Sequence, residues 1–333
     1  MKNACIVGYG AIGPIHAEAV ARADHARLYA VCDSDADKLS LCREKYDVLT
    51  YADYQAAVND PKIDVIHICT PHYLHKEMAV RAMEAGKDVV LEKPAAMNRD
   101  ELAQIQQTQA LTGRRVCLML QNRTNAAIQA LKAMADDPAL GKLVGIEGAM
   151  TWHRDAAYYR SGAWRGTWTQ EGGGVLINQA VHLIDLFSYL GGGIQSVRAS
   201  ISTKYLDGII EVEDTADGLL TLPGGVRACF YATNAYDTNK PFRIELEFEN
   251  ALLRYADNRL YKIADTAEVV ASDDMDTPGK RYWGVGHQYV ISQFYQSLAA
   301  GGRYISLADG INTMEALFAF YESAKAGGKE IKL

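Results

Sequence analysis

The sequence has no excess of positive charge and no long apolar run. Its 34 lysines and arginines are outnumbered by 41 aspartates and glutamates, and the net charge of −7 argues against a nucleic-acid or anionic-membrane partner. No apolar stretch approaches membrane-spanning length, and a strand predicted at residues 4–7 leaves no room for a signal peptide. The six cysteines lack metal-ligand spacing, so we expect a reduced, cytoplasmic protein without a bound metal.

The length of 333 residues predicts two domains. In the first 120 residues, short apolar segments alternate with helical ones. Strands are predicted at 4–7, 28–32, 65–69, 89–91 and 116–120, with helices between them at 15–22, 35–45, 76–85 and 99–111. Wholly apolar strands are typical of a parallel sheet that is covered on both faces. The first part of the chain is therefore predicted to be a doubly wound α/β domain.

The pattern changes after about residue 122. Segment 242–249 alternates strictly between apolar and polar residues, which indicates a strand with one buried and one solvent-facing side. Further strands are predicted at 143–151, 196–203, 219–222 and 226–231, and a helix at 312–326. The second part is thus predicted to contain a largely antiparallel sheet with some helices.

A glycine-rich segment joins the first predicted strand to the first helix; it consists of Gly8, Tyr9, Gly10, Ala11, Ile12 and Gly13. Glycines permit close approach of a pyrophosphate, and the helix N-terminus then faces the phosphates. Asp33 ends the second strand, where a carboxylate binds the adenosine ribose hydroxyls and repels a 2′-phosphate. The sequence therefore favours NAD over NADP, although aspartate at this position also suits helix capping.

Two further segments follow predicted strands and should lie at the same sheet edge. Thr70, Pro71 and His75 are expected beside the cofactor, although His75 equally suits a packing or capping role. Glu92 and Lys93 follow the next strand, which the proline after them terminates. An ammonium group at this edge stands where nicotinamide and substrate meet. This placement favours a catalytic or substrate-binding Lys93 over a solvated strand-end lysine.

A second candidate catalytic group follows the glycine run at residues 172–174. Asn178, His182 and Asp185 fall at helical spacing, so they should share one face of a helix that begins near residue 176. Histidine suits proton transfer because its ordinary pKa lies near neutrality, whereas the alternative is a core histidine bonded to backbone. We expect His182 to be catalytic, Asn178 to contact substrate and Asp185 to be structural.

The segment 152–168 is rich in tryptophan, tyrosine and arginine. Aromatic faces beside hydrogen-bonding side chains suit a polyhydroxylated ligand, although aromatics also fill protein interfaces. We expect Tyr159, Trp164 and Arg165 to contact the substrate.

Together, these motifs resemble those of the Gfo/Idh/MocA family of sugar and inositol oxidoreductases. The resemblance covers nearly the whole chain, and its motifs are the fingerprint followed by His16, Thr70-Pro71-x-x-x-His75, Glu92-Lys93-Pro94, Gln121-Asn122-Arg123, Trp164-Arg165-Gly166, Glu171-Gly172-Gly173-Gly174 and Asn178-Gln179-x-x-His182-x-x-Asp185. It implies an N-terminal Rossmann domain (1–121) and a C-terminal α/β domain (122–306) with a large, open, mostly antiparallel sheet for substrate and oligomer contacts. A final helix (307–333) is expected to return to the Rossmann domain.

The family resemblance also implies roles for residues. The lysine and histidine of the family motifs carry over onto Lys93 and His182. Some members have aspartate where this chain has Asn178, so a carboxylate partner for His182 is missing there. His72 stands where the family has asparagine, and its role stays open. Because open sheets in the family pair between subunits, we expect a homodimer or homotetramer.

The expected reaction is reversible oxidation of a secondary alcohol of a sugar, cyclitol or nucleotide-linked sugar by NAD. His182 would accept the hydroxyl proton while Lys93 stabilises the developing alkoxide, or Lys93 would itself be the base. Two alternatives remain from the sequence. One is glycoside hydrolysis through oxidation, elimination and re-reduction at a retained NAD. The other is a non-catalytic NAD-binding regulator, against which the presence of Lys93 and His182 argues.

Overall fold

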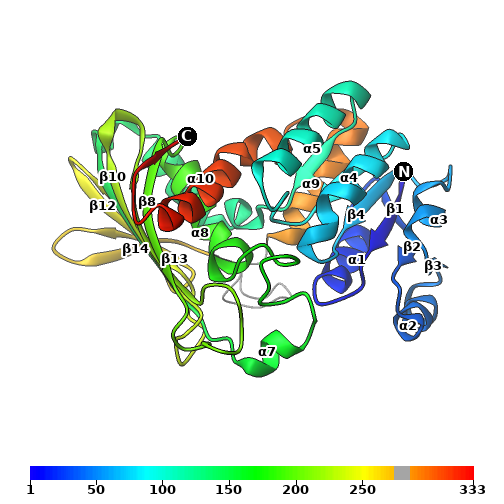
Figure 1. Ribbon diagram of the computed structural model, residues 1–333. Coiled ribbons are helices and arrows are strands. Elements are labelled where there is room, and N and C mark those ends of the chain that lie inside the picture. Colours follow the sequence, from blue (N-terminus) through cyan, green and yellow to red (C-terminus); the bar gives the residue numbers. More distant parts are fainter. Residues whose placement is uncertain (274–285) are drawn as a thin grey trace. The chain divides into compact units, whose positions relative to one another are not determined.

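The structure, a computed structural model, describes residues 1–273 and 286–333 and divides into two compact units. The first unit contains residues 1–120 and 287–310, and the second contains residues 121–286 and 311–333. Figure 1 shows the elements of each unit along the chain.

The first unit is built on a parallel sheet of six strands in the order β3-β2-β1-β4-β5-β6. Its strands are β1 (Lys2–Val7), β2 (Ala26–Cys32), β3 (Leu49–Tyr51), β4 (Val65–Ile68), β5 (Asp88–Leu91) and β6 (Val116–Leu118). Its helices are α1 (Gly13–Arg22), α2 (Ala36–Tyr46), α3 (Tyr54–Val58), α4 (His75–Glu84), α5 (Arg99–Thr112) and α9 (His287–Ala300). The strand order reverses between β1 and β4, which is the point where a doubly wound sheet binds its ligand. The predicted doubly wound domain is confirmed.

The second unit is built on a nine-stranded sheet in the order β14-β13-β12-β11-β7-β10-β9-β8-β15. Its strands are β7 (Leu143–Thr151), β8 (Ser196–Ser202), β9 (Thr215–Thr221), β10 (Arg227–Thr233), β11 (Arg243–Phe248), β12 (Ala251–Ala256), β13 (Arg259–Ile263), β14 (Ala267–Ser272) and β15 (Ile331–Lys332). All of the paired strands are antiparallel except β7 and β10. The predicted large, mostly antiparallel sheet is confirmed.

Helices cover one face of this sheet. They include α6 (Ala126–Ala135), α8 (Val181–Gly191) and most of α10 (Leu307–Lys325), whereas the short helix α7 (Ala156–Arg160) lies among the loops of this unit. In Figure 1, α8 and α10 lie along the sheet. Glycines in the strands allow these helices to approach the sheet closely. A Cβ at Gly148 of β7 would lie 2.9 Å from the Phe187 ring of α8, and one at Gly218 of β9 would lie 2.7 Å from the Phe320 ring of α10.

Two segments lie in a different unit from the domain that the sequence predicts for them. Residues 287–306, expected in the second domain, lie in the first unit because Val290, Ile291 and Phe294 of α9 join its hydrophobic core. Most of the final helix, expected on the Rossmann domain, lies in the second unit. There Ser323 of α10 accepts a hydrogen bond from the Ala199 amide of β8 at 2.9 Å.

Candidate active site

The glycine-rich loop between β1 and α1 has the geometry of a phosphate cradle. Gly8 has a φ of +90°, and a Cβ there would lie 2.7 Å from the Cys69 carbonyl oxygen. A Cβ at Gly13 would collide with the Gly8 carbonyl, so both positions need glycine for the fold itself. At Gly10 nothing lies within 4 Å of the added Cβ, so no described protein atom requires glycine there. The open space at Gly10 lies just before α1, and the N-terminus of a helix is where anionic groups bind.

The Asp33 carboxylate lies against this loop. It accepts hydrogen bonds from the Tyr9 amide at 2.6 Å and from the Asp35 amide at 2.9 Å. The N-cap of α2 is Asp35, whose side chain accepts from the amides of Asp37 and Lys38. Asp33 therefore does not cap α2, and its position beside the glycine loop suits a ribose contact.

His75 connects two loops at the carboxyl edge of the sheet. Its ring nitrogens lie 2.7 Å from the Pro94 carbonyl oxygen and 2.9 Å from the Thr70 carbonyl oxygen. Burial lowers the pKa of His75 against the opposing effect of these two carbonyls. A neutral ring has one N–H, so it donates to one of the two loops at a time. His75 thereby holds the loop of Thr70 and Pro71 and the loop after Lys93 near each other.

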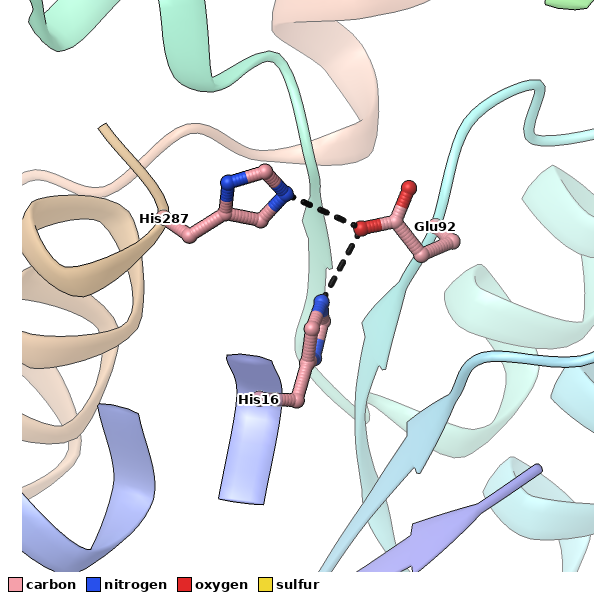
Figure 2. A group of neighbouring side chains, drawn as sticks. All are labelled: His16, Glu92 and His287. Carbon is pink, nitrogen blue, oxygen red and sulfur yellow. Dashed lines mark hydrogen bonds and ion pairs between the residues drawn. The ribbon is translucent and has the colours of Figure 1, made fainter. Parts of the chain in front are cut away.

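Glu92, directly after β5, is the centre of a buried cluster (Figure 2). Its Oε1 atom lies 2.9 Å from Nε2 of His16 on α1 and 3.5 Å from Nε2 of His287 on α9. His16 is fully buried, and Glu92 and His287 are each 5% exposed. Burial opposes ionisation of Glu92, but the bonds from His16 and His287 outweigh it and hold its pKa well below the usual value. Glu92 is therefore a buried carboxylate.

The charge on Glu92 fixes the direction of a longer hydrogen-bonded chain. An ionised carboxylate only accepts, so His16 donates from Nε2; burial lowers the pKa of His16, and its Nδ1 is then the acceptor. That atom lies 3.0 Å from Nδ1 of His67 on β4, which must donate. Nε2 of His67 then accepts from the Tyr295 hydroxyl of α9 at 2.8 Å. We call the four residues Tyr295, His67, His16 and Glu92 the histidine chain.

Lys93 directly follows Glu92, the last residue of the histidine chain, in the sequence. Its amide donates to Oε2 of Glu92 at 3.2 Å, and the residue is half-buried after β5. The sequence predicts that Glu92 contacts the cofactor, and in the structure its carboxylate is the acceptor at the end of the histidine chain. His16, Glu92 and His287 also offer three metal-ligand atoms within 4.8 Å of one another, but each serves in the hydrogen bonds and ion pairs of Figure 2.

In the second unit, His182 follows a π-helical turn rather than a regular helix. Residues Leu176–Ala180 are π-helical and lead directly into α8, so the expected single helix is wider in its first turn. His182 is 7% exposed, and its Nε2 lies 3.3 Å from the Gln121 amide nitrogen. Gln121 therefore donates to this nitrogen and orients the ring.

The other polar residues of this helix have separate partners. Asp185 is 1% exposed and forms a two-pronged ion pair with Arg123, whose Nε lies 2.9 Å from Oδ2. It also accepts from Thr313 at 2.8 Å, which gives it the structural role expected from the sequence. Asn178 donates to the carboxylate of Glu171, which is 1% exposed. A carboxylate thus lies next to Asn178 although none is present at position 178.

The aromatic segment converges on the helix α7. Arg165 donates from Nη1 to the Tyr158 hydroxyl at 2.6 Å, and its guanidinium lies 4.5 Å from the Trp164 ring centroid. Tyr159 is 5% exposed, and its hydroxyl accepts from the Asn234 amide at 3.2 Å. Tyr159, Trp164 and Arg165 are the residues of this segment that are expected to contact the substrate. Of these, Arg165 donates a hydrogen bond to Tyr158 and is linked through it to further polar groups.

Another buried carboxylate, Glu213, lies beside the glycine run. It accepts from the amides of Gly174 at 3.0 Å and Leu176 at 2.9 Å, and from the Tyr321 hydroxyl at 3.0 Å. Burial outweighs these bonds and raises the pKa of Glu213 to about 7. The carboxylate therefore holds the start of the His182 helix and titrates near neutrality.

Each unit gathers part of the predicted site. In the first unit, the carboxyl ends of β1, β2, β4 and β5 bring Gly8, Asp33, Thr70 and Lys93 to one sheet edge. The histidine chain was missed, although one histidine within the otherwise apolar strand Val65–Ile68 was a signal that a buried polar partner exists. No motif indicated the roles of Tyr158 or Glu213.

These features define a class: a dinucleotide-binding Rossmann domain with a lysine at its ligand-binding edge, followed by a second domain with an open sheet. Family models agree with this class. Residues 2–120 match the oxidoreductase family with an NAD-binding Rossmann fold, and residues 128–254 match the GFO/IDH/MocA C-terminal domain. The chain belongs to the GFO/IDH/MocA family, and the expected NAD-binding fold is confirmed.

Several characterised proteins are similar to this chain. Levoglucosan dehydrogenase of Pseudarthrobacter phenanthrenivorans is 26% identical over 72% of this chain and 66% of its own length. Myo-inositol 2-dehydrogenase of Thermotoga maritima is 25% identical over 83% of this chain and 80% of its own length. The chain spans 66%, 62% and 60% of three of the curated relatives it matches.

A solved structure covers the whole chain. The WlbA dehydrogenase of Chromobacterium violaceum, in complex with NADH and UDP-GlcNAcA, has a TM-score of 0.88 and 26% identity over 100% of this chain and 96% of its own. Among the described residues, no helix combines the length and the apolar character needed to cross a membrane.

Proposed function

We propose that this chain is an NAD-dependent oxidoreductase that transfers hydride between NAD and a secondary alcohol of a sugar, cyclitol or nucleotide-linked sugar. The observation that carries the proposal is the sheet edge of the first unit, where the glycine loop, Asp33 and Lys93 follow β1, β2 and β5 of one parallel sheet. The names of the relatives, which are dehydrogenases of levoglucosan, myo-inositol and a UDP-sugar, support the substrate class.

The cofactor residues in this proposal are those of the carboxyl edge. The amides of Gly10, Ala11 and Ile12 would bind the pyrophosphate, and Asp33 would bind the ribose hydroxyls. The loop of Thr70 and Pro71, held by His75 and joined to the Glu92 loop, would line the nicotinamide side. When bound, NAD supplies the hydride acceptor. NAD is proposed over NADP because the Asp33 carboxylate would repel a 2′-phosphate.

Two side chains are proposed to act on the alcohol. His182 accepts the hydroxyl proton, and Lys93 donates a hydrogen bond to the hydroxyl oxygen and stabilises the charge that develops on it. Arg165, Trp164, Tyr159 and Asn178 are proposed to bind the remaining hydroxyls. The Gln121 amide donates to Nε2 of His182 and positions the imidazole, so the substrate hydroxyl would replace this donor before the ring accepts its proton.

The substrate class is tested by incubating the purified chain and NAD with a panel of sugars, inositols and nucleotide sugars while NADH absorbance is recorded. NADH formation with at least one member supports the proposal. A panel without NADH formation contradicts it. Release of a free sugar from a glycoside without net NADH would identify the hydrolytic alternative instead.

The role of His182 is tested by its pH dependence. With an imidazole base, kcat/KM for oxidation rises with pH through an ionisation near neutrality, because only the neutral ring accepts the proton. His182→Asn should abolish this ionisation and most turnover while NAD affinity is retained. The same ionisation in an active His182→Asn enzyme would move the base elsewhere, first to Lys93.

The assembly proposed is a homodimer or homotetramer that pairs through the open sheet. Support comes from the outward positions of β9 and β10, where Leu219 is 48% and Tyr231 42% exposed while the alternating residues are buried against helices. Light scattering at micromolar concentration tests this, and a monomeric mass would contradict it.

All six cysteines are free, which supports the proposed location in a reducing compartment, the cytoplasm.

A further inference from the structure

The hydroxyl of Tyr158 is surrounded by hydrogen-bond donors. Arg165 Nη1 lies at 2.6 Å, Gln179 Nε2 at 3.2 Å and Asn178 Nδ2 at 3.4 Å from this oxygen. The amide orientations are fixed by other partners, because Asn178 also donates to the Glu171 carboxylate and the oxygen of Gln179 accepts from Asn234. All three contacts therefore donate to Tyr158.

These donors occupy the accepting side of the phenol and leave its proton to point elsewhere. A phenol oxygen accepts through its lone pairs and has one O–H to donate. Burial raises the pKa of Tyr158 despite the opposing charge of Arg165, so the proton is retained. Within residues 1–273 and 286–333, no hydrogen bond from this O–H to an acceptor is present.

The ring that carries this hydroxyl is fixed and partly accessible. The guanidinium of Arg165 lies 4.4 Å and that of Arg154 lies 5.0 Å from the Tyr158 ring centroid, and such contacts restrict ring orientation. Tyr158 is half-buried, whereas the neighbouring Tyr159 is 5% exposed. Of the two tyrosines, Tyr158 is the more exposed residue.

We infer that Tyr158 is a specificity-determining residue that donates a hydrogen bond from its hydroxyl to an oxygen of the polyhydroxylated substrate. Arg165, Gln179 and Asn178 are the positioning residues that direct this donor. The inference rests on the proposed function and adds to it the group that recognises a substrate oxygen other than the reacting one.

Tyr158→Phe tests the contact because it removes the hydroxyl and keeps the ring. With a substrate identified by NADH formation, the KM should rise by roughly threefold to tenfold, the size of one lost neutral hydrogen bond, with kcat and NAD affinity within about twofold. Tyr261→Phe is the matched control, because Tyr261 is also half-buried but lies on β13 of the sheet; its KM should not change.

Deoxy analogues of the substrate, each lacking one hydroxyl, provide the second measurement. For the analogue that lacks the contacted oxygen, wild type and Tyr158→Phe should have equal KM values, which a merely structural effect of the substitution would not produce. An unchanged KM in active Tyr158→Phe enzyme, a KM that rises only in Tyr159→Phe, or an equal penalty for every analogue would overturn the inference. Wild-type protein that forms no NADH from any alcohol would contradict the proposed function as well.

Discussion

The polar networks of the two units end differently. In the histidine chain of the first unit, each hydrogen has an acceptor inside the chain, from the Tyr295 hydroxyl through His67 and His16 to Glu92. In the second unit, the donors around Tyr158 converge on one oxygen, and among the described residues no acceptor takes its proton. A closed network stabilises one backbone position, here that of Lys93, whereas an open one presents a hydrogen bond to a ligand.

The buried carboxylates Glu92 of the first unit and Glu213 of the second differ in pKa because their hydrogen-bond partners differ. Glu92 accepts from two histidine side chains, and its pKa is held well below the usual value. Glu213 accepts mainly from backbone amides, and burial raises its pKa to about 7. Similar burial thus gives a permanent charge in the first unit and a titrating group in the second, because the partners decide how well the charge is compensated.

The largest expected effect is the loss of turnover on substitution of Lys93, whose backbone position the histidine chain stabilises. Lys93→Ala should lower turnover by roughly a hundredfold or more while NAD binding is retained, the scale of losing one electrostatic or acid–base group. Lys93→Arg should restore little because a guanidinium has different geometry and stays charged. Steady-state kinetics would measure this, with the exposed Lys62→Ala as control. Near-normal turnover of Lys93→Ala would make the lysine structural.

Glu213 should make the stability of the second unit depend on pH. Its pKa is raised from 4.5 to about 7 on folding, so the folded state binds the proton more tightly than the unfolded state. The free energy of unfolding should therefore fall as pH rises from about 4.5 to about 7, by at most about 3 kcal/mol.

Glu213→Gln should flatten this pH dependence, whereas Glu268→Gln, at an exposed position of β14, should leave it in place. Urea unfolding at a series of pH values would measure both. The same slope in wild type and Glu213→Gln would assign the titration to another group.

Asp33 should set the preference between the two nicotinamide cofactors. In Asp33→Asn the side chain keeps its size but loses the charge that repels a 2′-phosphate, so the affinity for NADP relative to NAD should rise about tenfold. Fluorescence titration with both cofactors would test this, and the exposed Asp37→Asn should keep the wild-type ratio. Tighter binding of NADP than of NAD by the wild type would contradict the role of Asp33.

The smallest effect should come from the first member of the histidine chain. Tyr295→Phe removes the donor to His67 and leaves a buried acceptor unsatisfied, which should lower the free energy of unfolding by about 1 kcal/mol. Tyr289→Phe on the same helix alters an exposed residue and should have no effect. Unchanged stability of Tyr295→Phe would show that the chain is not closed as described.

Short-range signals predicted the first unit better than the second. The apolar strands and the glycine loop were recognised because their patterns are local, but β3 (Leu49–Tyr51) was missed because it is a short edge strand with no fully buried residue. Helix α9 lies in the first unit through Phe294 and its neighbours, and an apolar helix face does not specify which core it joins. The π-helical turn before His182 and the donors around Tyr158 depend on contacts between distant residues, which spacing does not reveal.

Transfer of a labelled hydrogen from substrate to NAD is a direct test of the proposed hydride transfer. A substrate from the panel, deuterated at the carbon that bears the reacting hydroxyl, is oxidised with NAD, and the mass of the reduced cofactor is measured. We expect reduced cofactor that is heavier by one deuterium, in amounts equal to the ketone formed. Reduced cofactor without deuterium, or a product released with no reduced cofactor, would contradict hydride transfer from a secondary alcohol.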